Sequence, residues 1–203
     1  LSLYEEMYGS DTNHADIAMV LSNLGARYND TKDYSKAEAY SKRALDMYRC
    51  VYGEKSVHHN IIRVIRNIGN TYILQRDYKQ AVEWYRKPVD MLTQHHHPQT
   101  DHRDIAGALK QLGNFHSDIK LYDGAHKYLN QSLEMYQKIH GTDGNDEDIA
   151  NLLLSMGSNC GSNSDHSTGL EYKLRALDMY REVYGKDACH ADIARALHNI
   201  GVS

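Results

Sequence analysis

Hydrophobic positions along the chain recur at the spacing of α-helices. In residues 58–74, Ile61, Ile65 and Ile68 are four and three positions apart, and Tyr72 continues the row four positions later. This spacing places the side chains on one face of a helix, with polar residues on the other faces. Similar rows stand at residues 17–28, 105–116 and 149–160. The pattern therefore predicts a series of amphipathic helices, and no segment shows the sustained alternation of a β-strand.

A second amphipathic row follows each of the first. Between residues 34 and 52, small and apolar side chains stand at Ala37, Ala44 and Tyr48, and the row ends at Gly53. A glycine directly after an amphipathic row is typical of a helix C-terminus, and Gly185 stands at the corresponding place. We expect a tight turn at 30–33 within each helix pair and a longer loop at 53–57 after it.

These helix pairs repeat every 44 residues without a slip. Three sets of positions keep this interval, namely glycine (Gly25, Gly69, Gly113, Gly157, Gly201), isoleucine (Ile17, Ile61, Ile105, Ile149, Ile193) and methionine (Met47, Met91, Met135, Met179). The complete repeats are 14–57, 58–101, 102–145 and 146–189, preceded by the end of a repeat at 1–13 and followed by the start of one at 190–203. One helix pair cannot bury its apolar faces alone, whereas a stack of pairs can. We therefore expect residues 1–203 to be one all-α array, an excerpt of a longer one.

Particular residues predict how the helices begin and pack. Asn13, Asp101 and Asn145 are the expected N-caps, each followed three residues later by a carboxylate that suits the positive helix end. Gly25 and Ala37 are expected where the two helices of a pair approach closely, because a larger side chain there would overpack the contact.

Two repeats depart from this pattern. The second has Pro88 where the others have alanine or serine, and a proline within a helix removes one hydrogen bond and favours a bend. The fourth has Gly161 and Gly169 inside predicted helix, so we expect this corner to be the least stable part of the array. Drift in a tolerant repeat is one explanation of both departures, and a designed bend or a partner site is the other.

Composition and charge argue against several classes of function. The net charge of −4 gives no general attraction to nucleic acid or to an anionic membrane. The longest apolar run is too short to span a bilayer, and the three cysteines form no CxxC pair. We expect a cytoplasmic protein that binds neither nucleic acid nor membrane.

Candidate chemistry is sparse. No P-loop, dinucleotide-binding, nucleophile-elbow or HExxH motif occurs, so we expect no catalytic residue and no cofactor. His95–His97 and His102 invite a metal interpretation, but adjacent loop histidines need not converge and no cysteine pair completes a site. We expect no metal site. A further histidine set shares one register of the repeat, and a capping or packing role is the expected one; its members are His14, His58, His102 and His190.

The repeat resembles a known family. Leu21, Leu24, Gly25 and Tyr28, followed by alanine twelve positions after the glycine and again seven later, are similar to a tetratricopeptide repeat. The long period and the segment ALDMYREVYGKDACHADIA at 176–194 resemble the kinesin-light-chain and nephrocystin-3-like branch. This resemblance covers the whole chain. It implies a right-handed α-solenoid of stacked antiparallel helix pairs that acts as an interaction scaffold.

The face opposite the buried row is the candidate binding surface. In solenoids of this type the first helices line a concave groove, where asparagines hold the backbone of an extended peptide, since an amide both donates and accepts hydrogen bonds. Positively charged residues flank this face in the second and third repeats, so we expect a preference for acidic peptides. The predicted peptide-binding residues are Asn23, Arg63, Arg66, Asn67, Asn70, Lys110, Gln111 and Asn114. A polar exposed face of any amphipathic helix is the alternative explanation.

Three functions remain open from the sequence. The first is a non-catalytic scaffold that binds a protein or peptide. The second is a structural module that self-associates through its uncapped ends, where exposed terminal helices would bury apolar surface against another chain. The third is the sensor region of a larger signalling NTPase.

Overall fold

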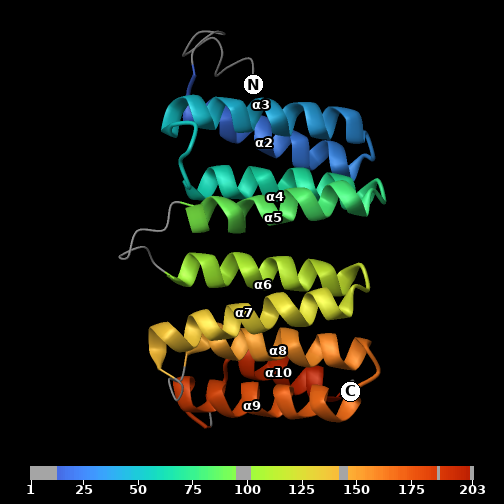
Figure 1. The fold of residues 1–203 in the computed structure, drawn as a ribbon, viewed down its shortest axis with the longest axis vertical. Coiled ribbons are helices and arrows are strands. Elements are labelled where there is room, and N and C mark those ends of the chain that lie inside the picture. Colours follow the sequence, from blue (N-terminus) through green and yellow to red (C-terminus); the bar gives the residue numbers. More distant parts are fainter. Residues whose placement is uncertain (1–12, 95–101, 142–145, 187, 202–203) are drawn as a thin grey trace. The chain divides into compact units, whose positions relative to one another are not determined.

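The computed structural model describes residues 13–94, 102–141, 146–186 and 188–201, without the side chains of His102 and His140. All regular structure in these ranges is α-helical, in agreement with the predicted all-α fold. The helices are α2 (Ala15–Asp30), α3 (Tyr34–Tyr52), α4 (His59–Leu74), α5 (Tyr78–Gln94), α6 (His102–Asp118), α7 (Tyr122–His140), α8 (Glu147–Ser162), α9 (His166–Tyr184) and α10 (Ala191–Gly201). Even-numbered helices are the first helices of the repeats, and α3, α5, α7 and α9 are the second helices (Figure 1).

Two compact units make up the chain, Leu1–His96 and His97–Ser203, called here the N-terminal and C-terminal units. In the N-terminal unit, α2 pairs with α3 and α4 pairs with α5. In the C-terminal unit, α6 pairs with α7, α8 pairs with α9, and α10 packs on α9 and α8. Within each unit the pairs are antiparallel and stacked, and each first helix also touches the next first helix. This is the arrangement that the 44-residue period predicted.

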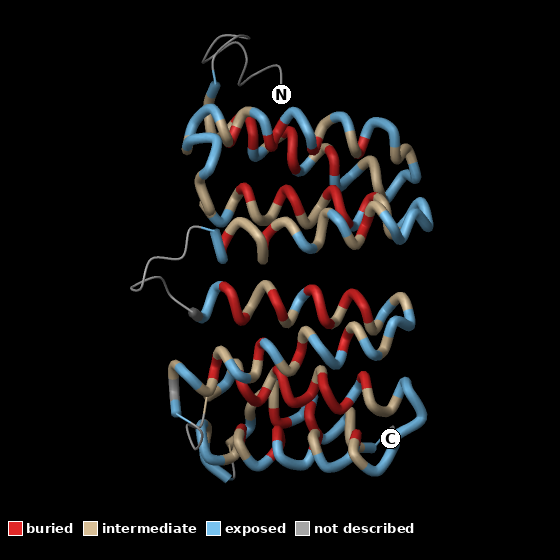
Figure 2. The backbone as a smooth tube through the Cα atoms, viewed as in Figure 1, coloured by how far each residue is buried: buried red, intermediate tan, exposed pale blue. Residues whose placement is uncertain are grey.

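Each unit has its own apolar core between first and second helices. In the N-terminal unit the core is formed by Ile17, Leu21 and the α4 row around Ile65, closed by the fully buried Tyr48 of α3. In the C-terminal unit, Leu153 and Tyr180 hold the corresponding places. Figure 2 shows buried positions recurring along one side of each helix. The apolar rows read from the sequence are therefore the core.

Glycine permits the close helix contacts that the sequence predicted. A Cβ atom at Gly25 would lie 3.0 Å from the backbone oxygen of Ala37 and closer still to the Ser41 hydroxyl. At Gly157 it would lie 2.7 Å from the backbone oxygen of Gly169. Gly169 thus belongs to a tight crossing of α8 and α9, which explains a glycine inside the first turn of a helix.

Helix N-termini differ from the prediction. The cap of α2 is His14 and not Asn13, because His14 Nδ1 accepts a hydrogen bond from the backbone N–H of Asp16 at 3.2 Å. His58 and His190 use the same ring atom for the backbone N–H two residues later. A neutral imidazole nitrogen accepts as an asparagine oxygen does, so the histidine register has the capping role expected for it.

The remaining capping predictions have mixed outcomes. Asp101 and Asn145 lie outside the described residues, and α8 is capped by Asp146, which occupies the histidine register of the fourth repeat. Gly53 and Gly185 end α3 and α9 with φ of 100°, as predicted for C-terminal glycines.

Pro88 lies buried inside α5, which continues without a break from Tyr78 to Gln94. The helix therefore accommodates the proline with the loss of one backbone hydrogen bond and without ending there. Whether Pro88 serves a partner stays a prediction.

Candidate functional site

The first-helix face, which we define as the side of the first helices opposite the buried row, is open to solvent. Of the predicted residues on or beside it, Asn23, Asn70 and Gln111 are exposed. Partly buried are Arg63, Arg66, Asn67, Lys110 and Asn114. The helical phase deduced from the sequence is thus correct on both sides of the helix, and all eight predicted residues are on the accessible side.

In the N-terminal unit this face is hollowed between α2 and α4. A pocket of about 340 Å³ lies there. We call it the N-terminal groove, lined by Ala26, Asn29, Asp30, Asn67, Asn70, Ile73 and Leu74. It brings together two of the predicted residues, Asn67 and Asn70. Asp30 is its only charged lining residue and forms an exposed ion pair with Arg27 at 3.5 Å.

Amide side chains join the two helices that form the N-terminal groove. Asn29 Nδ2 donates to Thr71 Oγ1 at 3.0 Å, and Asn67 Nδ2 donates to Ser22 Oγ at 3.4 Å. Asn29 Oδ1 is buried and has no hydrogen-bond partner within the described residues. The groove is therefore walled by oriented amides, one of which retains an unused acceptor.

Two predicted arginines lie outside this groove. The guanidinium of Arg63 is near Tyr48, where burial raises the pKa of the Tyr48 hydroxyl although the Arg63 charge opposes the rise. Within the described part of the chain, neither the Tyr48 hydroxyl nor Arg63 Nε has a hydrogen-bond partner. Arg66 is partly buried on the same helix and does not line the groove.

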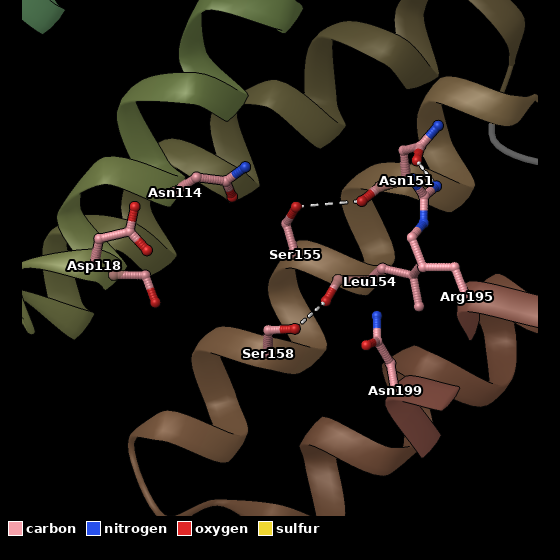
Figure 3. A pocket seen from close by; sticks show the side chains of 9 residues that line it. Asn114, Asp118, Asn151, Leu154, Ser155, Ser158, Arg195 and Asn199 are labelled. Atoms are coloured by element: carbon pink, nitrogen blue, oxygen red, sulfur yellow. Dashed lines mark hydrogen bonds between the residues drawn. The ribbon is translucent and has the colours of Figure 1, made fainter. Parts of the chain in front are cut away.

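The first-helix face of the C-terminal unit carries a second pocket, of about 400 Å³, formed by α6, α8 and α10 (Figure 3). We call it the C-terminal groove, lined by Asn114, Ser117, Asp118, Asn151, Leu154, Ser155, Ser158, Arg195 and Asn199. Figure 3 places Asn114 and Asp118 on one side of it, Arg195 on the other, and the two serines of α8 between them. Of the predicted residues, only Asn114 lines it.

Hydrogen bonds within α8 determine what the floor of the C-terminal groove offers. Ser155 Oγ donates to the backbone oxygen of Asn151 at 3.3 Å, and Ser158 Oγ donates to that of Leu154 at 3.0 Å. A hydroxyl has one hydrogen, so these serines present only acceptor lone pairs to a ligand.

The charge of Arg195 is already engaged. Its Nη2 donates to the Tyr180 hydroxyl at 3.1 Å and to Asn151 Oδ1, and its guanidinium is in an ion pair with Asp192. Lys110 does not line the groove. Burial lowers the pKa of Lys110, and the charge of Asp148, which opposes this shift, does not cancel it. The C-terminal groove is therefore less cationic than the sequence predicted.

Sequence reasoning missed the contribution of Asn29, because the residue lies beside the predicted row and not on it. Asn151, Asn199 and Ser155 line the C-terminal groove and were not among the predicted residues either. The available signal for the last three was the 44-residue register, because Asn151 is equivalent to Arg63, and Ser155 and Asn199 are equivalent to Gln111.

Other chemistry finds little support. Within the described ranges, no group of three or more His, Cys, Asp or Glu could hold a metal ion. His95–His97 lie outside those ranges, and the side chain of His102 is not described. None of the described helices is both long enough and apolar enough to cross a membrane.

Comparisons with known proteins agree with the helical geometry. Two family models, both described as tetratricopeptide repeat, match residues 16–94 and 105–146, together more than half of the chain. No curated protein sequence matches the chain significantly.

Solved structures share the fold at low sequence identity. BtubC (BKLC) from P. vanneervenii is 16% identical with a TM-score of 0.63, over 85% of this chain and 66% of that protein. The apo form of RapI is 17% identical with a TM-score of 0.67, over 100% of this chain and 52% of RapI. A kinesin-light-chain-type protein of Podospora anserina with nearly identical TPR-like repeats is 12% identical with a TM-score of 0.65, over 94% of this chain and 87% of that one. The chain thus spans about two thirds of BtubC and half of RapI.

Proposed function

The chain belongs to the tetratricopeptide repeat family, and we propose that it binds protein partners by taking an extended peptide segment along its first-helix face. One observation carries this proposal: in both units that face is hollowed into a groove lined by asparagine amides, beside apolar residues in the N-terminal unit and beside serine hydroxyls in the C-terminal unit. Such groups hydrogen-bond to a peptide backbone whatever its side chains are. A groove of this kind suits a scaffold that binds an extended peptide segment of a protein partner, as members of this family generally do.

Asn67 and Asn114 are the residues that test the proposal. Each lines its own groove and was predicted from the sequence. We expect Asn67→Ala and Asn114→Ala each to weaken peptide binding by about fivefold, the usual worth of one hydrogen bond. Alanine favours helix more than asparagine does, but Asn67→Ala also removes the hydrogen bond to Ser22, so the thermal unfolding of each variant is measured beside its binding.

The measurement is a peptide-array binding screen of the native chain and the two variants at two salt concentrations. Asn130→Ala, on the second helix α7, is the matched control and should leave the hits unchanged. If the same peptides bind with unaltered affinity to both groove variants, the first-helix face is not the site. Loss of all hits in the Asn130 variant would equally contradict it.

The predicted preference for acidic peptides is assigned to the N-terminal unit. Arg63 and Arg66 lie side by side on α4, and the buried Nε of Arg63 has no hydrogen-bond partner among the described residues. Replacing both by glutamine should weaken salt-sensitive binding of acidic peptides severalfold. Unchanged affinity would remove the preference while leaving the groove proposal intact.

Self-association is a second candidate, favoured by one specific observation. Leu170 and Leu174 on α9 and Leu197 on α10 are exposed large apolar side chains within one unit. Apolar surface of this kind is buried when another copy packs against it. Sedimentation over a hundredfold range of concentration tests this candidate, and a constant monomer mass would exclude it. A Leu174→Glu variant should abolish any assembly that is seen.

A further inference from the structure

We propose that the C-terminal groove binds a basic side chain of the partner, arginine or lysine, at Asp118. This inference rests on the proposed function, since it names the chemistry that one groove of that site selects. It reverses, for this unit, the acidic preference expected from the sequence. Three observations carry it: the position of Asp118, its lack of a partner among the described residues, and the acceptors beside it.

Asp118 occupies an unfavourable place for a carboxylate. It is the last residue of α6, where the aligned peptide dipoles put partial negative charge. The walls of the groove also remove part of its water, and this desolvation raises the pKa of Asp118. Both effects penalise the ionised carboxylate, and a cation bound beside it would relieve both.

Nothing among the described residues supplies that cation. The Asp118 carboxylate makes no hydrogen bond or ion pair with them, and desolvation alone shifts its pKa. Asp30, which has the same repeat register in the N-terminal groove, forms its ion pair with Arg27 instead. Arg195 does not compensate Asp118 either, because it lies across the groove and pairs with Asp192.

The rest of the groove also suits a donor-rich ligand. Ser155 and Ser158 give their hydrogens to their own helix, so they offer only acceptor oxygens between Asp118 and Arg195. A guanidinium carries five N–H donors and no acceptor, and an ammonium carries three. A basic side chain can therefore satisfy the carboxylate and the hydroxyl oxygens together, whereas an acidic one would find no donor at Asp118, Ser155 or Ser158.

The direct test titrates the 15N-labelled chain with N-acetyl-arginine amide and with its neutral isostere, N-acetyl-citrulline amide. Side-chain amide signals of Asn114, Asn151 and Asn199 report on the groove. We expect the arginine probe to shift these signals at concentrations three- to tenfold below those needed for the citrulline probe. Asp118→Asn should abolish that difference. Asp30→Asn, the matched control in the other unit, should leave it unchanged. Equal shifts for the two probes, or a difference that persists in Asp118→Asn, would overturn the inference.

A second readout separates a binding role from a structural one. If the Asp118 carboxylate binds a ligand but destabilises the folded chain, Asp118→Asn should raise the melting temperature by about 1–3 °C. A lowered melting temperature would show that the carboxylate supports the fold, and would count against the inference.

Peptides distinguish this inference from the function on which it rests. An array of 12-residue peptides with one guest position, occupied by arginine, citrulline or glutamate, is screened against the native chain and Asp118→Asn. Binding that favours arginine only in the native chain supports both proposals. Binding without such a preference contradicts the basic-ligand inference alone. A response to the arginine probe without any peptide hit contradicts the peptide-binding function alone.

Discussion

The two units build the same groove from different side chains. In the N-terminal groove, amides are bonded from one helix to the next and the single carboxylate, Asp30, has an arginine partner. In the C-terminal groove, hydroxyls are bonded within α8, the arginine is neutralised, and the carboxylate of Asp118 is left without a described partner. The shared repeat thus determines where a groove lies, while substitutions on its exposed face determine which ligand it accepts.

The two units also differ in the hydrogen bonding of an equivalent buried tyrosine. Tyr48 and Tyr180 occupy one repeat register and are both fully buried. The Tyr180 hydroxyl accepts a hydrogen bond from Arg195, whereas the Tyr48 hydroxyl has no partner within the described part of the chain. A repeat can therefore conserve a buried shape without conserving its hydrogen bonding, and the predictions below test this contrast.

The largest effect is expected at a glycine contact. A Cβ at Gly157 would meet the backbone oxygen of Gly169 at 2.7 Å, and a backbone cannot move aside easily. We expect Gly157→Ala to lower the free energy of unfolding by about 1–3 kcal/mol. At Gly69 the obstacle is the Tyr85 ring, which can rotate, so Gly69→Ala should cost less.

Urea denaturation of both variants measures the difference. Gly161→Ala is the control, because a Cβ there has nothing within 4 Å, and it should stabilise the chain by about 0.5–1 kcal/mol through helix propensity. Equal losses for Gly157→Ala and Gly69→Ala would show that the crossing of α8 and α9 is no tighter than that of α4 and α5.

The next effect concerns the paired tyrosines. Tyr180→Phe removes a partner of Arg195 at a buried site, and we expect a loss of about 1 kcal/mol in the free energy of unfolding. Tyr48→Phe removes a buried hydroxyl that has no hydrogen-bond partner among the described residues, so stability should stay the same or rise. Thermal and urea unfolding of the two variants compare them directly. If Tyr48→Phe is the more destabilising, the hydroxyl of Tyr48 has a partner and the contrast fails.

A smaller gain in stability is expected when a missing helix cap is supplied. Asp33, Asp77 and Asp165 accept a backbone N–H at the start of their second helices, but the same register in the third repeat is Leu121, which makes no cap bond and is 51% exposed. Leu121→Asp should raise the free energy of unfolding by about 1 kcal/mol. Leu121→Ala separates the cap from the removal of exposed apolar surface. A variant with aspartate no more stable than the one with alanine would contradict the capping explanation.

The smallest effect is a dependence on pH. The His58 cap requires an unprotonated Nδ1, and burial, with the neighbouring His59 charge, lowers the pKa of His58 from 6.5. The unfolded chain then takes up the proton more readily than the folded chain does. The stabilisation by the His58 cap is therefore complete above pH 6.5 and is lost as the pH falls through the lower folded-state pKa. The loss should be at most about 1 kcal/mol, the typical worth of a cap.

Unfolding measured between pH 7.5 and 5 detects this loss. In His58→Asp the cap should persist, as it does at Asp146 of α8, and this part of the dependence should disappear. A pH dependence that persists unchanged in His58→Asp would contradict the capping explanation.

Much of the architecture could be read from the chain. The spacing of Ile61, Ile65 and Ile68 requires one face of the helix to be apolar. The unbroken interval between equivalent glycines requires the helix pairs of successive repeats to pack in the same way. Both conclusions are local, because they depend on helix periodicity and on the space that one side chain needs. The candidate site was less predictable: the predicted residues are on the solvent-accessible side of the first helices, but only Asn67, Asn70 and Asn114 of them line a groove.

By itself, then, the sequence determined the helices, their pairing and the side of each first helix that meets solvent, since all three follow from spacing along one chain. Tertiary structure alone decided the cap at His14, the contribution of Asn29 and the isolation of Asp118. These features depend on distances between side chains of different helices, or on which of two adjacent acceptors reaches a backbone N–H. A repeat pattern does not encode such distances, because neighbouring helices with the same register can place different atoms within 3 Å of each other.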